Sequence, residues 1–425
     1  MIKSIILAAG KGTRMKSSTP KVLHTIFDKT LLEYVVDAVN NTEMVDENFI
    51  IVGHQAERVE EYITKVSPNS KCVLQSPQLG TGHAVSMVLP YLEDFDGEVI
   101  ILCGDTPLIT DETLKEFINS HKQQNSDLTV MSAIFDNPTN YGRIIRNQDG
   151  SLNSIVEEKD ATSEQKSVKE VNAGIYCLNW AKIKTAFGEL KTNNAQGEYY
   201  LTDIIKWANA NSLKVNAYIL NNNDEIFGIN SKAHLAEATK ILNQRIIERH
   251  LDNGVQIISP ETTWISPETE IEADTIIYPC CYLNGKNKIG KNCKIGPFAH
   301  LRGDVVLEDN VKIGNFVEVK KTTIKSNTNA CHLSYLGDSE IGSNVNIGAG
   351  TITANYNPLT KTKSKTIIED EVKIGSNSVL VAPVTIENGA NVAALSCITK
   401  NIPAWGLALT RAPLKVIEAW VKRFK

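Results

Sequence analysis

The first half of the chain alternates short aliphatic runs with amphipathic segments. The runs NFIIVG (48–53), EVIILCGD (98–105) and VNAGIYCL (171–178) have the length and composition of buried strands. Between them, residues 31–39 and 111–124 carry apolar side chains at helical spacing. Strands that alternate with helices predict an α/β domain with a largely parallel, Rossmann-like mixed sheet.

The second half has a six-residue period instead. After Val319 the register slips by one residue at 324 and again at 341, and it resumes for six positions between Ile368 and Ile398. A hexapeptide period predicts a β-helix over roughly 255–405, because each six residues form one short strand and a turn. The strands of a sandwich would show a period of two. The first ten aliphatic positions in phase are Ile265, Ile271, Ile277, Leu283, Ile289, Ile295, Leu301, Leu307, Ile313 and Val319.

A helical segment separates the two patterns. Between 232 and 251 the apolar residues return at helical spacing, and Asn253-Gly254 supplies a C-terminal stop. We therefore predict three parts: an α/β domain over 1–231, a linker helix over 232–254, and a left-handed parallel β-helix with a C-terminal tail over 255–425.

Composition narrows the class of protein. The formal net charge is −5 and no basic block stands out, which argues against binding of nucleic acid or a membrane surface. The eight cysteines have irregular spacings and form no C-x-x-C pair, a pattern typical of reduced thiols rather than of disulfides or a zinc site. No apolar run approaches the ~18 residues of a membrane span or resembles a signal peptide. We expect a cytoplasmic protein that acts on small molecules.

A glycine-rich turn, LAAGKGTRM (7–15), follows the first aliphatic run. Gly10 and Gly12, with Lys11 and Arg14 beside them, suggest backbone amides and cations gathered around phosphate. The spacing matches neither a P-loop nor a dinucleotide fingerprint, so on spacing alone a purely structural turn explains it equally well. Asp105 lies at the carboxyl end of a predicted strand, where it is either a metal ligand or a turn cap.

Several further motifs carry a resemblance to known enzymes. They are TPK ending at Lys21, QSPQLGTGHA (75–84), YGRI (141–144), IVEEKDA (155–161), VNAGIY (171–176) and FGINS (227–231). With the glycine turn and Asp105, they resemble sugar-phosphate nucleotidyltransferases. Together with the hexapeptide repeats, nearly the whole chain resembles the bacterial GlmU family of bifunctional N-acetylglucosamine-1-phosphate uridyltransferases and glucosamine-1-phosphate N-acetyltransferases.

The resemblance implies a nucleotide site in the first domain. Nucleotidyl transfer brings two polyanions together, so Arg14 and Lys21 suit the role of catalytic cations. A Mg²⁺ ion held by Asp105 and Asn230 is implied as well. Cys103 stands where relatives commonly have an aromatic residue. The other residues implied to bind UTP or the N-acetylglucosamine moiety are Leu7, Ala8, Ala9, Gly10, Gln75, Gly80, Thr81, Gly104, Gly142, Glu157 and Asn172.

The resemblance implies an acetyl-transfer site in the β-helix. Acyl transfer to an amine needs a base with a pKa near neutrality, and His332 is implied to supply it, whereas His300 is expected to be structural. The implied ligands of the sugar phosphate are Arg302, Lys320, Tyr335, Asn346 and Lys363; an insertion leaves Lys361 as an alternative to Lys363. The positions implied to contact acetyl-CoA are Ala349, Asn355, Tyr356, Ser376, Ala394 and Arg411.

These observations predict a bifunctional enzyme. It acetylates glucosamine 1-phosphate with acetyl-CoA and then joins N-acetylglucosamine 1-phosphate to UMP from UTP, releasing pyrophosphate and giving UDP-N-acetylglucosamine for the cell envelope. The resemblance also implies a homotrimer. The alternative is a single-activity nucleotidyltransferase whose β-helix only assembles subunits. A metal-dependent β-helix lyase would need three clustered histidines, but the β-helix offers only His300 and His332.

Overall fold

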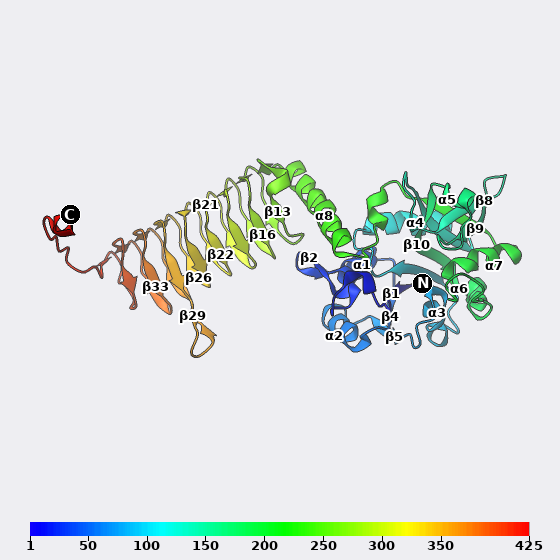
Figure 1. The fold of residues 1–425 in the computed structure, drawn as a ribbon. Coiled ribbons are helices and arrows are strands. Elements are labelled where there is room, and N and C mark those ends of the chain that lie inside the picture. Colours follow the sequence, from blue (N-terminus) through cyan, green and yellow to red (C-terminus); the bar gives the residue numbers. More distant parts are fainter. Residues whose placement is uncertain (425) are drawn as a thin grey trace. The chain divides into compact units, whose positions relative to one another are not determined.

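The computed structural model describes residues 1–424, and these form two compact units, 1–241 and 242–424 (Figure 1). The boundary falls within helix α8 (Lys232–Asp252), which matches the helix predicted over 232–251. Among residues 1–424, no helix combines the length and the apolar character needed to cross a membrane.

The first unit is built on the predicted mixed sheet. β1, β4, β5 and β6 are parallel, whereas β10 runs antiparallel to both of its neighbours, β6 and β7. The strand order is β11 (Val215–Ile219), β7 (Leu128–Ile134), β10 (Glu170–Asn179), β6 (Glu98–Cys103), β1 (Ile2–Leu7), β4 (Glu47–Val52) and β5 (Lys71–Leu74). β8 (Arg143–Arg146) pairs with β10 and with β9 (Leu152–Val156), and β2 (Thr25–Ile26) pairs with β3 (Lys29–Thr30).

Helices cover both faces of this sheet. Because side chains alternate along a strand, the neighbours Ile5 and Ile6 belong to two different apolar cores, one on each face. Thr30 and Thr110 cap α1 and α4 by accepting backbone N–H bonds at 3.1 and 3.2 Å, which fixes where the predicted helices begin. The helices are α1 (Leu31–Asn41), α2 (Ala56–Val66), α3 (Thr81–Ser86), α4 (Asp111–Gln123), α5 (Ser163–Lys166), α6 (Trp180–Ile183) and α7 (Ile204–Ala210).

The second unit is the predicted left-handed β-helix, and its three parallel sheets are the faces of a prism. The first sheet contains β12 (Gln256–Ile257), β15 (Ile276–Ile277), β18 (Lys294–Ile295), β21 (Lys312–Asn315), β24 (Asn329–His332), β27 (Asn346–Ile347), β32 (Lys373–Ile374), β35 (Asn391–Val392) and β37 (Leu407–Ala408). The second contains β13 (Trp264–Ile265), β16 (Tyr282–Asn284), β19 (His300–Arg302), β22 (Glu318–Lys320), β25 (Tyr335–Gly337), β28 (Ile352–Ala354), β33 (Val379–Val381) and β36 (Cys397–Ile398). The third contains β14 (Glu270–Ile271), β17 (Asn287–Ile289), β20 (Val305–Leu307), β23 (Thr323–Ile324), β26 (Ser339–Ile341), β31 (Thr366–Ile368) and β34 (Val384–Ile386).

The two register slips in the sequence correspond to shortened coils. Ile295 lies beside Ile313, 18 positions further along, but Ile313 lies beside Ala330 after only 17 positions. Ala330 lies beside Ile347, again 17 positions on. Each slip therefore removes one residue from a coil and still leaves the aliphatic residue inside the prism. The next coil is lengthened by a hairpin of β29 (Tyr356–Asn357) and β30 (Thr362–Lys363).

Helix α8 protects one end of the β-helix. The Asn243 side chain donates to the carbonyl oxygen of Thr263 at 2.8 Å and accepts from the backbone N–H of Ile265 at 3.1 Å. These bonds satisfy backbone groups on the outer edge of β13, which no other strand covers. An uncovered edge of this kind would recruit other strands, so the side chain of Asn243 substitutes for a neighbouring coil.

Candidate functional site

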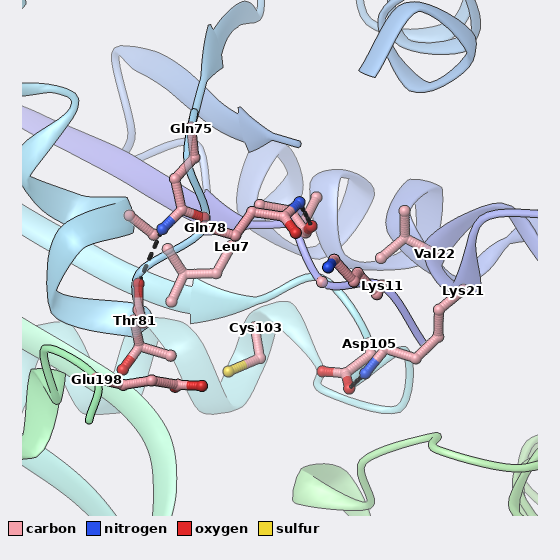
Figure 2. Close-up of a pocket in the computed structure, with 15 residues that line it drawn as sticks. Leu7, Lys11, Lys21, Val22, Gln75, Gln78, Thr81, Cys103, Asp105 and Glu198 are labelled. Carbon is pink, nitrogen blue, oxygen red and sulfur yellow. Dashed lines mark hydrogen bonds and ion pairs between the residues drawn. The ribbon is translucent and has the colours of Figure 1, made fainter. Parts of the chain in front are cut away.

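A cavity of about 460 Å³ opens where β1 and β6 end at their carboxyl ends, as expected for a ligand site in an open α/β sheet (Figure 2). Most of the residues expected to bind nucleotide line it. The lining consists of Leu7, Ala8, Ala9, Gly10, Lys11, Lys21, Val22, Gln75, Gln78, Gly80, Thr81, Ala84, Cys103, Asp105 and Glu198.

The glycine turn lies directly against the segment that carries Lys21. Gly12 has a φ of 59°, and a Cβ placed there would lie 2.6 Å from Cβ of Lys21. Any larger residue would therefore have to push Lys21 away from the cavity. Both the positive φ and the close approach of Lys21 therefore favour glycine at position 12, and the turn positions the Lys21 cation.

The 75–84 segment forms the opposite wall. Gln75 Nε2 donates to the carbonyl oxygen of Gly80 at 2.9 Å, and Gln78 Nε2 donates to the carbonyl oxygen of Ala9 at 2.6 Å. A Cβ on Gly80, whose φ is 115°, would lie 2.6 Å from the carbonyl oxygen of Tyr199. Gly80 therefore allows this wall to pack against the 198–201 segment.

The cations and the expected metal ligands lie together. The Lys21 ammonium donates a hydrogen bond to the Asp105 carboxylate and another to Asn230 Oδ1, the latter at 3.2 Å (Figure 2 shows the first pair). The Arg14 guanidinium donates to the same Asn230 oxygen at 2.9 Å. The backbone N–H of Ile229 donates to the carbonyl oxygen of Asp105 at 3.0 Å, which holds the two distant segments together. The Asp105 carboxylate and the Asn230 amide oxygen both contact the Lys21 ammonium. Two such oxygen donors side by side suit a hard divalent cation.

Three other expected residues form a separate group near β8, β9 and β10. A Cβ on Gly142 would lie 3.5 Å from Oε2 of Glu157 and 3.6 Å from Cβ of Asn172. Glu157 accepts a hydrogen bond from the Thr202 hydroxyl at 3.2 Å, and burial raises the pKa of its carboxyl group above the usual value. None of the three lines the cavity described above, and neither does Gly104, whose N–H donates to the carbonyl oxygen of Leu7 at 2.9 Å.

Cys103 lies between the cavity and this second group. Its thiol is 3.7 Å from the carbonyl oxygen of Gly174, which is two residues beyond Asn172. Burial, followed by the nearby Asp105 carboxylate, raises the pKa of the Cys103 thiol to about 12. The Cys103 thiol is therefore uncharged, and it does not repel a phosphate group in the cavity.

In the β-helix, three cationic side chains gather where strands of the second sheet end. Arg302 and Lys320 end the adjacent strands β19 and β22, and Lys363 reaches them from the β29–β30 hairpin. The pKa of Lys320 is lowered, first by contact with Lys363 and then by burial and by Arg302. Mutual repulsion of this kind is relieved by a bound anion, so the arrangement suits a phosphate. Lys361, in the turn of the hairpin, has no such contact with Lys320.

The remaining polar residues lie at two corners of the coil: Asp338 adjoins Lys320, whereas His332 adjoins Asn315 at the preceding corner. Asn355 Nδ2 lies 3.4 Å from the Tyr335 hydroxyl and donates to the Asp338 carboxylate. His332 ends β24 with an exposed side chain, and its carbonyl oxygen accepts from the Ser334 hydroxyl at 2.8 Å. Asn346 follows on the next strand of the same sheet, β27. An exposed imidazole can take a proton from an amine that is bound beside it.

Comparison with known proteins identifies the family. Residues 3–238 match the Nucleotidyl transferase family, and residues 288–321 match the Bacterial transferase hexapeptide (six repeats) family. The Bifunctional protein GlmU of Thermoanaerobacter pseudethanolicus is 44% identical over 99% of this chain and 97% of its own length. The corresponding proteins of Acetivibrio thermocellus and Clostridioides difficile are 43% and 42% identical over the same shares of both chains. The chain belongs to the GlmU family.

Membership of the GlmU family confirms the predicted resemblance, the fold class and the bifunctional enzyme that makes UDP-N-acetylglucosamine. A likeness over nearly the full length of GlmU proteins argues against the single-activity alternative, because it includes the β-helix as well as the nucleotidyltransferase domain.

The residues expected to contact acetyl-CoA lie in several places. The backbone N–H of Asn377 donates to the carbonyl oxygen of Ala349 at 2.7 Å, and that of Leu395 donates to the carbonyl oxygen of Ser376 at 2.8 Å. These bonds place Ala349, Ser376 and Ala394 in one row along successive coils. Tyr356 is exposed on the hairpin, and Arg411 is exposed in the tail after β37.

Two polar residues of the cavity lining escaped the sequence analysis. Gln78 lies within a quoted motif but carries no distinguishing pattern, and Glu198 lies in a segment without periodicity. Hydrogen bonds between segments bring Glu198 to the cavity: the backbone N–H of Tyr199 donates to the carbonyl oxygen of Leu79 at 2.8 Å, and that of Gly82 donates to the carbonyl oxygen of Tyr199 at 2.8 Å. His300 is half-buried and stacks on Tyr282 with ring centroids 5.3 Å apart, consistent with the expected structural role.

Proposed function

We propose that the two candidate sites catalyse consecutive reactions. The β-helix acetylates glucosamine 1-phosphate, and the nucleotidyltransferase domain converts the product to UDP-N-acetylglucosamine. The observation that carries the proposal is the convergence of Arg302, Lys320 and Lys363 beside Tyr335 and Asn355. Arg302 is paired with Glu318 at 2.9 Å, whereas Lys320 and Lys363 contact each other, and an assembly scaffold has no need of three cations gathered in this way. The proposal includes the division into domains 1–231 and 255–425 with a linker over 232–254. It also includes a cytoplasmic location.

In the acetyl-transfer step, the amine nitrogen of the sugar attacks the thioester carbonyl carbon of acetyl-CoA. A carbon–nitrogen bond forms, the carbon–sulfur bond breaks, and the CoA thiolate leaves. His332 accepts the proton that the amine loses, while the three cations hold the sugar phosphate. Tyr335 and Asn346 orient the sugar ring, whereas Asn355 and the row of Ala349, Ser376 and Ala394 contact acetyl-CoA.

In the uridyl-transfer step, a phosphate oxygen of N-acetylglucosamine 1-phosphate attacks the α-phosphorus of UTP and pyrophosphate leaves. Arg14 and Lys21 neutralise the triphosphate, and Gln75, Gly80 and Thr81 bind the nucleotide. Gly142, Glu157 and Asn172 bind the N-acetylglucosamine moiety. Asp105 and Asn230 are the residues that would hold Mg²⁺, which supplies positive charge to the phosphate oxygens when bound.

Mass analysis of the reaction products tests this function. We expect UDP-N-acetylglucosamine only when glucosamine 1-phosphate, acetyl-CoA and UTP are all present, and N-acetylglucosamine 1-phosphate when UTP is omitted. Conversion of supplied N-acetylglucosamine 1-phosphate without any acetylation of glucosamine 1-phosphate would support the single-activity alternative instead.

The β29–β30 hairpin offers a matched pair of lysines. Lys363→Ala should lower kcat/KM for acetyl transfer by about 10- to 100-fold, because a hydrogen bond to a charged group contributes about 1.5–3 kcal/mol. Lys361→Ala, in the turn of the same hairpin, should change it by less than about threefold. Steady-state acetylation assays on both variants decide which lysine contacts the phosphate. A larger loss for Lys361→Ala would reverse the assignment.

We propose in addition that the chain assembles as a homotrimer. Phe298 and Phe316 stack with ring centroids 5.1 Å apart on one corner of the β-helix, and Leu333 follows them on the next coil. The three side chains are 49%, 58% and 63% exposed in the single chain. A continuous apolar ridge beside His332 suits burial by a second copy, and cyclic symmetry closes such contacts.

Sedimentation equilibrium tests the trimer. We expect a mass three times that of one chain, and a smaller mass for Phe316→Asp, which buries a charge in the contact. Dissociation should abolish acetylation before uridyl transfer if neighbouring copies share the acetyl-transfer site. A monomer mass for the unmodified protein at micromolar concentration would contradict the proposal.

A further inference from the structure

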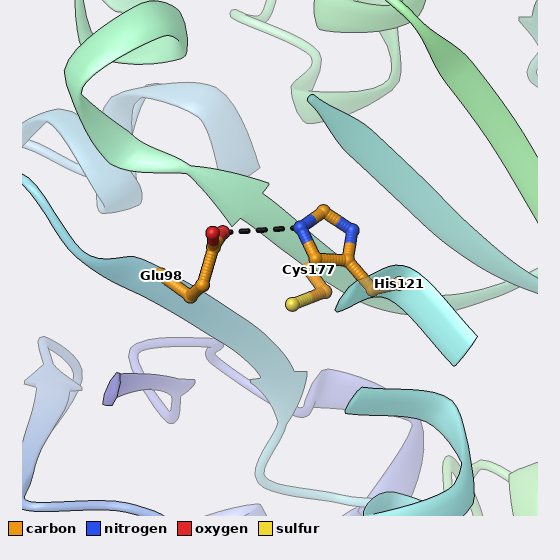
Figure 3. Close-up of side chains that lie close together, drawn as sticks. All are labelled: Glu98, His121 and Cys177. Carbon is orange, nitrogen blue, oxygen red and sulfur yellow. Dashed lines mark hydrogen bonds and ion pairs between the residues drawn. The ribbon is translucent and has the colours of Figure 1, made fainter. Parts of the chain in front are cut away.

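Glu98, His121 and Cys177 converge at the end of the sheet opposite the nucleotide cavity (Figure 3). Glu98 begins β6, His121 lies in the last turn of α4, and Cys177 lies within β10. One potential ligand atom from each residue lies within 4.8 Å of the other two. Within residues 1–424, no other group of three such side chains comes as close together.

The imidazole of His121 is held in one orientation. One ring nitrogen, Nδ1, lies 2.7 Å from the Thr129 hydroxyl, and the other, Nε2, lies 3.0 Å from a carboxylate oxygen of Glu98. His121 and Cys177 are both fully buried, whereas the Glu98 side chain keeps 21% of its surface exposed. A second partner that orients a histidine ring is a regular feature of metal sites.

We propose that Glu98, His121 and Cys177 form a binding site for a divalent transition-metal ion, with Zn²⁺ as the fitting ion. Nitrogen, sulfur and oxygen donors together are the ligand set of zinc and do not suit Mg²⁺. Metal–ligand bonds of about 2.0–2.3 Å need only small side-chain movements from the observed arrangement. Water can complete the coordination from the exposed side of Glu98.

Charge balance also favours a divalent ion. Binding replaces the thiol proton of Cys177 by a sulfur–metal bond and releases that proton to solvent. The thiolate and the Glu98 carboxylate then carry two negative charges, which the ion neutralises in a buried place. The proposed uridyl transfer does not use this site, because Glu98 begins β6 and Cys103, which lines the nucleotide cavity, ends it. The ion would tie β6, α4 and β10 together below the nucleotide cavity.

Cobalt titration of the full-length protein, first freed of metal by a chelator, tests the site. We expect one Co²⁺ per chain to bind with a near-ultraviolet thiolate-to-cobalt absorption band, and Zn²⁺ to displace it. Loss of an outer partner of a metal ligand costs about 10- to 100-fold in affinity, so Thr129→Val should weaken binding by that factor. Cys177→Ala should abolish the band and weaken binding by at least about 100-fold.

Two variants serve as controls. Cys72→Ala removes another thiol of the same unit, and Asp105→Asn alters the proposed Mg²⁺ site; both should keep the band. Zn²⁺ should raise the unfolding temperature of the unmodified protein, in proportion to its binding, but not that of folded Cys177→Ala. Absence of the thiolate-to-cobalt band in the folded protein, or its persistence in Cys177→Ala, would overturn the proposal and leave a structural His121–Glu98 hydrogen bond.

Discussion

Asp105→Asn is expected to lower uridyl transfer by about 10²-fold or more and to leave acetyl transfer nearly unchanged. The carboxylate lies at the carboxyl end of β6, where it pairs with Lys21 and adjoins Asn230. An amide in its place removes the negative charge that a divalent ion requires but preserves the size of the side chain. Rates of pyrophosphate release and of CoA release, measured on the same preparation, report the two activities separately.

Asp111→Asn provides the matched control. Asp111 lies only six residues further along and pairs with Lys115 at 2.8 Å on the surface of α4, outside the cavity. We expect both activities of this variant to stay within about twofold, because exposed ion pairs contribute little. An equal loss of both activities in folded Asp105→Asn would contradict the model of two independent sites.

The β-helix could be predicted from the sequence because its period is local. Each inward position, such as Ile295 or Ile313, lies six residues from the next, and the interior of the prism admits only aliphatic or small side chains. The slips at 324 and 341 could be seen in the same pattern, but their cause could not. Only the pairing of strands shows that each slip shortens one coil by a residue.

The corners of the β-helix show the limit of local rules. Asn292, Asn310 and Asn327 adopt a left-handed backbone conformation at equivalent corners, as asparagine readily does. Phe298 and Phe316 adopt the same conformation with φ of 57° and 54°, which no propensity rule predicts for bulky residues. Stacking between the two rings and the repeated geometry of the coil override the local preference.

The candidate sites were less predictable than the fold, since they join segments far apart in the sequence. Lys21, Asp105 and Asn230 meet only because strand order and the Ile229–Asp105 backbone bond bring them together. The motifs placed these residues at one site through family resemblance rather than through spacing. Cys177 shows the reverse case: irregular cysteine spacing indicated no zinc site, yet the fold brings Cys177 to His121 and Glu98.

His332 is the residue whose loss should affect acetylation most. Its side chain is exposed at the end of β24, so it contributes nothing to the aliphatic ladder of Ile324, Leu336 and Ile341. His332→Ala should therefore fold normally, and any loss of rate can be assigned to chemistry. His300→Ala, two coils before His332, is the matched control, because His300 stacks on Tyr282 and is expected to be structural.

His332→Ala should lower kcat for acetyl transfer by about 10²- to 10⁴-fold, the usual effect of losing a general base, while acetyl-CoA binding and uridyl transfer persist. Acetylation by folded His332→Ala within about threefold of wild type would fall well short of the loss expected for a base. The role of general base would then pass to a neighbouring group such as Tyr335, which begins β25 three residues further along the chain.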